Sequence, residues 1–358
     1  MLLRNMKTKI LKFEKSENYS ANIDKAVSFL KKGRLVAFPT ETVYGLGADA
    51  RNADAVRRLY QVKNRPLSKP CTILIARKNQ VTEYVPILSV VGERFVKRLW
   101  PGPLTIVFSR ADGEAIGLRM AAHTIASDLV LGAETPILAP SANLSGKSPP
   151  RNAQEVLQDL GGKIDLLLDD GVTRFKKAST VVQIEGEKWQ ILREGVLSER
   201  TLKRAAGTII LFVCTGNSCR SPMAEGLARL MLSQRLGINP EELEESGFIL
   251  TSAGVAAAVG ARASDNAMKV MGDEGLSIID HLSQPVASKM LNEADRVYCM
   301  TGSQVRRLRE MAPEKAEKIS LLDLEGQDIR DPLGGDLETY RKCAARIKRG
   351  IRKVLEEI

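Results

Sequence analysis

A short cysteine-containing segment beyond the middle of the chain carries the strongest chemical signal. In VCTGNSCRSP (213–222) an apolar run leads to Cys214, and Arg220 and Ser221 follow shortly afterwards. We expect Ser221 to be the N-cap of a helix and Pro222 its first residue. The backbone N–H groups of such a loop, together with the helix dipole, form an anion site and favour the thiolate of Cys214. Because Arg220 can hold a phosphoryl group through two hydrogen bonds, the segment predicts a thiolate that faces a bound phosphate.

A proton donor for the leaving group is available further along the chain. In-line attack on phosphorus needs such an acid, and Asp331 in IRDP (329–332) is the candidate. A cysteine by itself is most often a small buried hydrophobic residue, but here the neighbouring residues all suit one reaction. We therefore predict a phosphoryl-transfer site with Cys214, Arg220 and Asp331 as catalytic residues.

This segment resembles the active-site loop of the low-molecular-weight protein tyrosine phosphatases. The resemblance covers roughly residues 207–358 and rests on CTGNSCRSPMAEG (214–226), SAG (252–254), DH (280–281) and DP (331–332). It implies that Cys214 becomes a phosphocysteine, that Arg220 binds the phosphate, and that Asp331 is the general acid and later the base. Further residues would support the loop, and they are Asn217, Ser218, Cys219, Ser221 and His281.

The resemblance also assigns individual roles and two departures. Ser221 would hydrogen-bond the thiolate, and Cys219 would form a reversible disulfide with Cys214 under oxidation. Tyrosine phosphatases usually have a large aliphatic residue where Ser218 stands, and an aromatic residue where LGG (333–335) follows the Asp-Pro pair. Because the missing aromatic removes a stacking surface for a phosphotyrosine ring, and because both departures are closer to the bacterial protein-arginine phosphatases, we favour phosphoarginine slightly over phosphotyrosine.

The N-terminal half contains polar strings at the ends of apolar runs. Pro66 favours extended chain, so Lys63 and Arg65 would share one face and converge on phosphates. Ser141 and Asn143 follow an apolar strand, where open α/β sheets commonly bind ligands. Taken alone, each string is more often an ordinary turn or a solvated charge than a binding site. The strings are FPTETVYGLG (38–47), KNRP (63–66), WPGPLT (100–105), LRMAAH (118–123) and PSANLSG (140–146).

Together these strings resemble the YrdC-type L-threonylcarbamoyladenylate synthases over roughly residues 10–200. The resemblance implies condensation of L-threonine, bicarbonate and ATP to threonylcarbamoyl-AMP, the intermediate for the N6-threonylcarbamoyl modification of adenosine 37 in tRNA. The implied ATP contacts are Lys63, Arg65, Arg119, Ser141, Asn143 and Arg193, and Thr40 and Tyr44 would lie near threonine. Ala121 stands where the family usually has proline, which bears on the geometry of the local loop.

These assignments imply partners and leave one alternative open. ATP would arrive as its Mg²⁺ complex, and no protein-bound metal is expected. Beyond its small substrates, the chain would meet a phosphorylated protein and tRNA or tRNA-modification proteins. The alternative is that the N-terminal half is a double-stranded-RNA-binding module and that only the phosphatase is catalytic.

Composition and charge limit the class of protein. A length of 358 residues favours two domains. Five cysteines without a C-x-x-C pair, and only two histidines, argue against a disulfide-stapled secreted protein and against a zinc site. The charged N-terminus does not suit a signal peptide, and no apolar run reaches the roughly 20 residues of a membrane span, so we expect a cytoplasmic protein. Before residue 206 lie 33 of the 53 basic but only 21 of the 43 acidic residues, which suggests a polyphosphate or nucleic-acid ligand for that half.

Periodicity predicts the elements that must position these residues. In the N-terminal half, helices at 23–30, 56–60 and from 152 alternate with strands at 35–38, 72–76, 104–108, 137–139, 164–168 and 180–184, which indicates a mixed α/β sheet. The stretch 195–207 is interpreted as a linker or a bridging helix. Strands at 208–213, 249–251, 296–300 and 318–321 then alternate with helices at 223–236, 264–274 and 337–355, as in a Rossmann-like parallel sheet. We therefore expect a YrdC-like domain at 1–205 and a phosphatase-like domain at 206–358.

Overall fold

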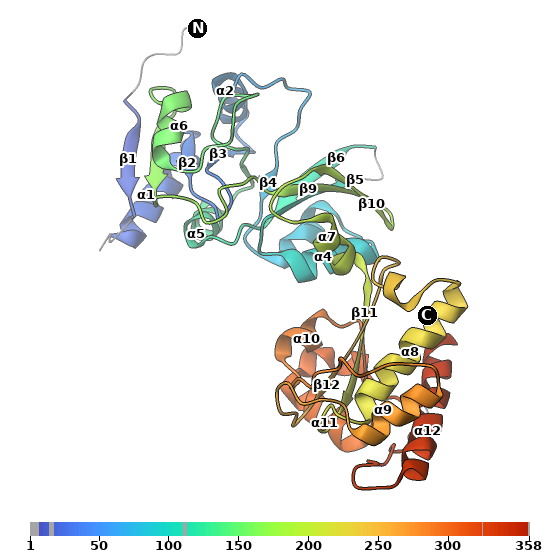
Figure 1. Cartoon of the computed structure of the whole chain (residues 1–358). Helices are drawn as coiled ribbons and strands as arrows, with labels where there is room; N and C mark the ends of the chain where they lie inside the picture. Colours follow the sequence, from blue (N-terminus) through green and yellow to red (C-terminus); the bar gives the residue numbers. More distant parts are fainter. Residues whose placement is uncertain (1–6, 14–17, 110–112, 324, 357–358) are drawn as a thin grey trace. The chain divides into compact units, whose positions relative to one another are not determined.

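The computed structural model describes residues 7–13, 18–109, 113–323 and 325–356 (Figure 1). The chain divides into two compact units, the first ending at Ala205 and the second beginning at Ala206. The division falls at the end of α7 (Glu199–Ala206), so the stretch interpreted as a linker or bridging helix is largely helical. Among the described residues, no helix combines the length and the hydropathy needed to cross a lipid bilayer.

The first unit is built on a mixed sheet that contains ten strands among its described residues. Their order is β1-β8-β2-β3-β7-β4-β6-β5-β9-β10, with parallel pairing between β1 and β8, β2 and β8, β4 and β6, and β5 and β9. The strands are β1 (Lys9–Lys12), β2 (Val36–Phe38), β3 (Gly45–Asp49), β4 (Ile73–Leu74), β5 (Leu104–Ser109), β6 (Ala115–Arg119), β7 (Ile137–Leu138), β8 (Leu166–Asp169), β9 (Thr180–Glu185) and β10 (Lys188–Arg193). The helices are α1 (Tyr19–Lys31), α2 (Ala53–Val62), α3 (Val81–Tyr84), α4 (Val90–Leu99), α5 (Thr124–Ala133) and α6 (Ala153–Leu160), with a 3-10 turn at Lys78–Gln80.

Helices cover both faces of this sheet. Successive side chains of β2 point to opposite faces and all three are buried, so both faces need a cover. Val36 and Phe38 pack into a core with α1 and α5, whereas Ala37 between them packs into a second core with α2 and α6. The start of α6 is as predicted, since Asn152 Oδ1 accepts a hydrogen bond from the backbone N–H of Glu155. The mixed α/β class predicted for this half is confirmed.

Strand β3 was not among the predicted strands, because its sequence GLGAD looks like a turn. The ring of Phe38 on the neighbouring β2 explains the glycines. A Cβ atom on Gly47 would lie 3.0 Å from a Phe38 ring carbon, and one on Gly45 would lie 3.4 Å from the same ring. The glycines therefore belong to the strand, where they make room for an aromatic side chain on the next strand.

The second unit is a parallel four-stranded sheet in the order β12-β11-β13-β14, counted over its described residues. Helices α8, α9 and α12 pack against one face, and α10 and α11 against the other. The predicted Rossmann-like parallel fold is confirmed. The strands are β11 (Thr208–Cys214), β12 (Phe248–Gly254), β13 (Arg296–Cys299) and β14 (Ile319–Leu321). The helices are α8 (Arg220–Leu236), α9 (Asp265–Asp273), α10 (Ser288–Glu293), α11 (Gly302–Met311) and α12 (Leu337–Glu356), with 3-10 turns at Pro240–Glu242 and Pro313–Lys318.

Candidate active sites

The cysteine-containing segment follows the central strand of the second unit. Strand β11 ends at Cys214, which is buried, and α8 begins at Arg220, so the loop between them lies at the carboxyl edge of the sheet and at a helix N-terminus. One local prediction is wrong. Cys219, not Ser221, is the N-cap, and Ser221 and Pro222 lie inside the first turn of α8. The reason is that the Ser221 hydroxyl bonds to the Cys214 sulfur instead of capping the helix.

Two groups of the loop contact the thiol of Cys214. Ser221 Oγ lies 3.0 Å from Cys214 Sγ, and the backbone N–H of Asn217 donates to the same sulfur at 3.2 Å. Asn217 has a φ of +53°, a left-handed conformation that asparagine tolerates better than most residues. This conformation directs a backbone donor at the sulfur, an arrangement that suits a thiolate.

A hydrogen-bond network fixes Asn217 in place. Its side-chain Nδ2 donates to Ser221 Oγ at 2.8 Å and to Ser252 Oγ at 3.0 Å, and its Oδ1 accepts from the backbone of Gln284. His281 Nε2 lies 2.7 Å from the Asn217 carbonyl oxygen. The structure therefore brings Asn217 and His281, both predicted to hold the loop, together at its centre.

Arg220 and Asp331 meet at the mouth of this loop. The buried Arg220 guanidinium donates to the Ile329 carbonyl oxygen at 3.0 Å and to Thr215 Oγ1 at 3.2 Å, and it forms an ion pair with the half-exposed Asp331 carboxylate. Arg220 Nε has no partner among the described residues. A phosphoryl group can take the place of the carboxylate on Arg220, which leaves Asp331 beside it as a proton donor.

Cys219 has polar neighbours from other elements that the sequence did not predict. Its sulfur is 3.3 Å from both Ser264 Oγ and Tyr340 Oη, and Ser264 Oγ donates to the same tyrosine at 3.2 Å. Burial, with Cys219 beside it, raises the pKa of Tyr340 to about 12. The Ser218 carbonyl accepts from the Ser264 backbone, and both cysteines of the loop are free thiols, so the disulfide between Cys214 and Cys219 stays a prediction.

In the first unit, three arginines from separate elements line one small cavity of about 120 Å³. Arg65 follows α2, Arg119 ends β6 and Arg193 ends β10. Burial lowers the pKa of Arg193, and repulsion by Arg119 and Arg65 adds to the effect. None of the lining residues is acidic, so the cavity attracts anions. The residues that line it are Val43, Arg65, Thr72, Thr105, Arg119, Ala139, Pro140, Ser141, Ala178, Ser179 and Arg193.

Backbone carbonyl groups hold two of these guanidinium groups. Arg65 donates to the carbonyl oxygens of Lys69 at 3.0 Å and Pro70 at 2.8 Å. Arg193 donates to the carbonyl oxygen of Ser179 at 2.8 Å. Neutral acceptors orient a cation without cancelling its charge, so both arginines keep their full attraction for an anion.

Lys63, predicted as a phosphate contact, supports the cavity from behind and does not line it. Its buried ammonium group donates to the carbonyl oxygens of Asn143, at 2.6 Å, and Ser141. Asn143 Nδ2 in turn donates to the carbonyl oxygens of Leu144 and Lys147, while its Oδ1 has no partner among the described residues. Of the Ser-x-Asn pair, the structure brings Ser141 to the cavity and uses Asn143 to shape the loop.

The two residues predicted near threonine, Thr40 and Tyr44, are buried inside the first unit. Thr40 Oγ1 donates to the Val43 carbonyl oxygen at 2.6 Å and lies 2.9 Å from Thr42 Oγ1. Tyr44 Oη donates to the Gly171 carbonyl oxygen at 2.8 Å. Both side chains are buried, and neither lines the arginine cavity or the larger cleft beside it. Their contact with threonine stays a prediction.

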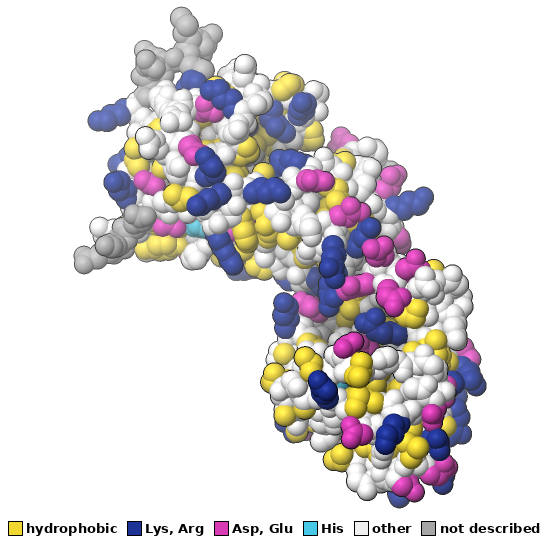
Figure 2. All heavy atoms as spheres, in the orientation of Figure 1, with side chains coloured by type: hydrophobic (Ala, Val, Ile, Leu, Met, Phe, Trp, Pro, Cys, Tyr) yellow, Lys and Arg dark blue, Asp and Glu magenta, His cyan; other side chains and the backbone are white. Residues whose placement is uncertain are grey.

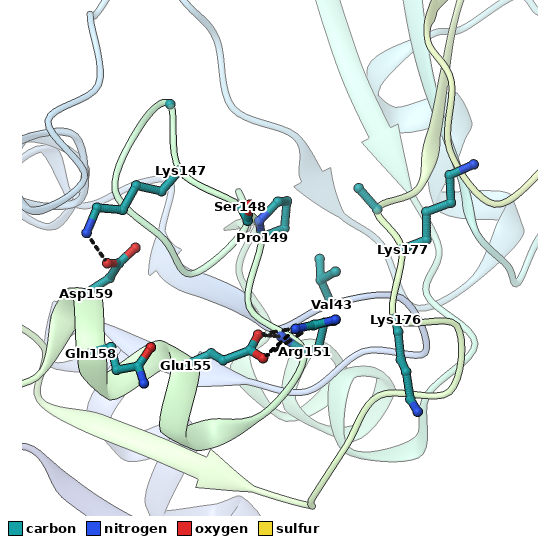
Figure 3. Close-up of a pocket in the computed structure, with 12 residues that line it drawn as sticks. Val43, Lys147, Ser148, Pro149, Arg151, Glu155, Gln158, Asp159, Lys176 and Lys177 are labelled. Atoms are coloured by element: carbon teal, nitrogen blue, oxygen red, sulfur yellow. Dashed lines mark hydrogen bonds and ion pairs between the residues drawn. The ribbon is translucent and has the colours of Figure 1, made fainter.

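A larger polar cleft of about 880 Å³ shares Val43 and Ala178 with the arginine cavity. Figure 3 shows Lys147 paired with Asp159 and Arg151 paired with Glu155 on its α6 side. Lys176 and Lys177 come from the opposite wall and form no ion pair within the described part of the chain. Among the described residues, no cluster of three or more His, Cys, Asp or Glu side chains could hold a metal ion. The arrangement suits a compact polyanion with a larger polar group attached to it.

Comparisons with known protein families agree with this division into two sites. The Sua5/YciO/YrdC family model, described as "Telomere recombination", matches residues 28–195. The model described as "Low molecular weight phosphotyrosine protein phosphatase" matches residues 209–358. The two matches fall within the first and the second unit respectively.

Named relatives match the first part of the chain. The threonylcarbamoyl-AMP synthase of Pyrococcus abyssi is 38% identical over 224 residues, which is 60% of this chain and 65% of that protein. The threonylcarbamoyl-AMP synthase of Bacillus subtilis is 34% identical over 235 residues, 62% of this chain and 68% of that protein. A solved structure of Pyrococcus abyssi Sua5 has a TM-score of 0.51 and 27% identity, and the match covers 88% of this chain and 98% of that one. This chain thus spans just under two thirds of the Pyrococcus synthase.

Proposed function

The chain belongs to the Sua5/YciO/YrdC family through its first unit and carries a low-molecular-weight phosphatase domain in its second, and we propose that it is a bifunctional enzyme. The first unit makes L-threonylcarbamoyladenylate from L-threonine, bicarbonate and ATP, for the modification of adenosine 37 in tRNA. The second hydrolyses phosphoryl groups from protein side chains. The partners that follow are tRNA or tRNA-modification proteins for the first product and a phosphorylated protein for the second site.

One observation supports the synthase proposal above all, the gathering of Arg65, Arg119 and Arg193 around one cavity. In the reaction, threonine carbamate attacks the α-phosphorus of ATP, the bond to the bridging oxygen breaks, and pyrophosphate leaves with its electron pair. Such a reaction needs orientation and charge neutralisation but no covalent nucleophile. The three guanidinium groups would hold the β- and γ-phosphates, the Mg²⁺ would arrive with ATP, and the adjoining cleft has room for the nucleoside and threonine.

Pyrophosphate release from ATP tests this proposal. We expect release that requires both threonine and bicarbonate, and that falls steeply when Arg65 or Arg193 is replaced by methionine. Arg57→Met is a matched control, because Arg57 is an exposed arginine of α2 whose one ion pair within the described part of the chain is with Asp54. Release that needs neither co-substrate would sink the synthase proposal. RNA binding by a chain that releases no pyrophosphate would favour the binding-module alternative.

The phosphatase proposal rests on the contacts of Cys214 with Ser221 Oγ and the Asn217 N–H. Cys214 Sγ would attack phosphorus while Asp331 gives its proton to the leaving atom, which leaves a phosphocysteine and the dephosphorylated side chain. Asp331, now a carboxylate, would then take a proton from water as the water attacks phosphorus, releasing phosphate and the thiolate. Arg220 and the loop N–H groups hold the phosphoryl oxygens throughout.

For the substrate we propose phosphoarginine rather than phosphotyrosine. Ser218 is a small polar residue of the loop that follows the nucleophile, and the exposed Leu333 offers no aromatic ring for stacking. Turnover of phosphoarginine and phosphotyrosine peptides of one sequence tests the choice. A higher kcat/KM for phosphoarginine is expected, and Ser218→Ile should reduce it relative to the tyrosine substrate. A preference of the unmodified chain for phosphotyrosine would overturn the choice.

A further inference from the structure

A buried ion pair lies behind the arginine cavity. Glu41 Oε1 accepts a hydrogen bond from Arg119 Nη2 at 2.8 Å, and both side chains are at least nine-tenths buried. Glu41 does not line the cavity, whereas Arg119 does. The sequence string 38–47 contains Glu41, but no feature of that string marks it as part of the site. Its contact with Arg119 joins two segments 78 residues apart along the chain.

The charge around the cavity explains why this contact matters. Three guanidinium groups line the cavity without an acidic residue, and like charges this close repel one another. Burial lowers the pKa of Arg193, and repulsion by Arg119 and Arg65 lowers it further. An arginine in such surroundings turns away from the other two unless an acceptor holds it, and carbonyl oxygens hold Arg65 and Arg193. For Arg119 the acceptor is the carboxylate of Glu41, which does not line the cavity. A buried pair of this kind fixes geometry more than it adds stability.

The geometry of the pair leaves part of Arg119 available to a ligand. Arg119 Nη2 donates both to Glu41 and to Thr42 Oγ1, each at 2.8 Å. Arg119 Nε is buried and has no partner among the described residues. An unpartnered buried donor on a residue that lines a cavity is a group that a ligand oxygen can satisfy.

Glu41 is itself fixed from both sides. Thr40 Oγ1 accepts from the backbone N–H of Thr42 and lies 2.9 Å from the Thr42 hydroxyl that faces Arg119. The Glu41 carbonyl oxygen accepts from the backbone N–H of Phe175 at 2.9 Å, immediately before the 176–178 wall of the cleft. The segment 40–42 is therefore a rigid support for one arginine.

We propose that Glu41 is a positioning residue for polyphosphate binding, holding the Arg119 guanidinium at the arginine cavity so that its unpartnered Nε–H is available to a ligand oxygen. Thr42 shares this role, and Thr40 orients Thr42. The proposal rests on the proposed synthase function, in which this cavity takes the β- and γ-phosphates of ATP. Through this contact, a residue that does not touch the substrate sets the affinity for its phosphates.

Inorganic pyrophosphate is the probe, because its binding to the full-length chain can be measured by calorimetry without turnover. We expect Glu41→Gln to weaken pyrophosphate binding by about 10- to 100-fold, the usual effect of losing a hydrogen bond to a charged group. Glu41→Asp, which keeps the charge, should recover part of this loss. In the synthase assay, Glu41→Gln should raise KM for ATP far more than KM for threonine. General damage to the fold would raise both.

Matched variants keep this test decisive. Asp54→Asn removes an exposed carboxylate from an arginine pair on α2 and should leave pyrophosphate binding unchanged. If Glu41→Gln does not fold, Thr42→Val decides the question, because it removes the second acceptor of Arg119 without leaving a charge unpaired. Wild-type affinity in whichever of the two variants folds would overturn the proposal. If the unmodified chain binds pyrophosphate but makes no threonylcarbamoyl-AMP, the synthase function fails, while a binding loss in Glu41→Gln still supports this role.

Discussion

Lys63 shapes the first site from a position outside both cavities. Its ammonium group is buried and bonds to carbonyl oxygens of the loop 140–146. Burial, together with repulsion by Arg65, lowers the pKa of Lys63 from the ordinary 10.5 to about 8. Its charge therefore changes in a pH range in which the arginines of the cavity stay protonated.

We predict that ATP binding weakens as the pH rises through about 8, because the neutral amine has lost its charge and one donor. Destabilisation of the fold by the deprotonation of Lys63 does not explain such a loss of ATP binding. The unfolded chain keeps the Lys63 proton up to about pH 10.5 and the folded chain only to about 8, so this group favours the folded state increasingly as the pH rises between them. KM for ATP against pH measures the effect. We expect this KM to rise above about pH 8, and Lys63→Arg, which stays charged, should abolish the rise in KM. An unchanged rise in that variant would refute the assignment of the effect to Lys63.

Ser221 is the side chain in closest contact with the proposed nucleophile. We expect Ser221→Ala to lower the rate of phosphocysteine formation roughly 10- to 100-fold, the effect of losing a hydrogen bond to a charged group. Rapid-mixing kinetics with an aryl phosphate measure this step. Ser233→Ala is the matched control, since Ser233 is a buried serine of the same helix and its hydroxyl bonds, among the residues described, to the Leu230 carbonyl oxygen alone. Equal rates in the two variants would argue against a role for the Ser221 contact.

The residues that the sequence pointed to differ from those it missed in one physical respect. Cys214, Arg220 and Ser221 lie in one loop and its helix, so their spacing alone predicts that they meet. Tyr340 and Ser264 reach Cys219 from other helices, and their types are ordinary in any helix or cap. Only the packing of α12 and α9 against the loop brings them there. Sequence spacing does not contain this information.

At the scale of elements, strand β3 depends on close packing against β2. The Phe38 ring lies over Gly45 and Gly47, and a Cβ on Gly47 would also lie 3.2 Å from the Val36 carbonyl oxygen. We predict that Gly47→Ala lowers the free energy of unfolding of the first unit by about 1–3 kcal/mol, as overpacking does elsewhere. Denaturant unfolding of the full chain, followed by the fluorescence of Trp100 and Trp189, measures it, since the only two tryptophans lie in this unit.

A second strand glycine provides the control for this prediction. Gly117 lies on β6, and a Cβ there would have no atom closer than 3.6 Å, so Gly117→Ala should be almost neutral. Phe38→Leu removes the ring, and the double variant Phe38→Leu/Gly47→Ala should be less destabilised than the sum of the two single changes. Additive effects would show that the ring is not what keeps Gly47 small.

Elements with a continuous apolar pattern were predictable, and elements at the sheet margin were not. Strand β11 is an unbroken buried run, and its extent was predicted within one residue. Strands β1 and β10 lie at the two edges of the ten-stranded sheet and are mostly exposed, so they carry no core pattern. Hydrogen bonding to a neighbouring strand defines them, and that neighbour is far away in the sequence for β1.

On the scale of the whole molecule, charge follows the division into units only in part. Lysine and arginine side chains lie at several separate places on the surface of the first unit (Figure 2). The basic excess before residue 206 is therefore not one binding patch, and the part that we propose to bind ATP is the small cavity with Arg65, Arg119 and Arg193. The uneven net charge of the two halves could not identify the ligand.

Each unit has its own sheet and its own hydrophobic cores, built among the described residues from its own segment of chain alone. We therefore predict two separate unfolding transitions in calorimetry of the full chain. Gly47→Ala should lower the temperature of the transition that belongs to the first unit. Pyrophosphate at about 100 times its Kd should stabilise that unit by about 2.7 kcal/mol and leave the other transition unchanged. Cys214→Ser should abolish phosphatase activity and leave the synthase rate as it was. A shift of both transitions by pyrophosphate, or a changed synthase rate in Cys214→Ser, would mean that the two sites are energetically coupled.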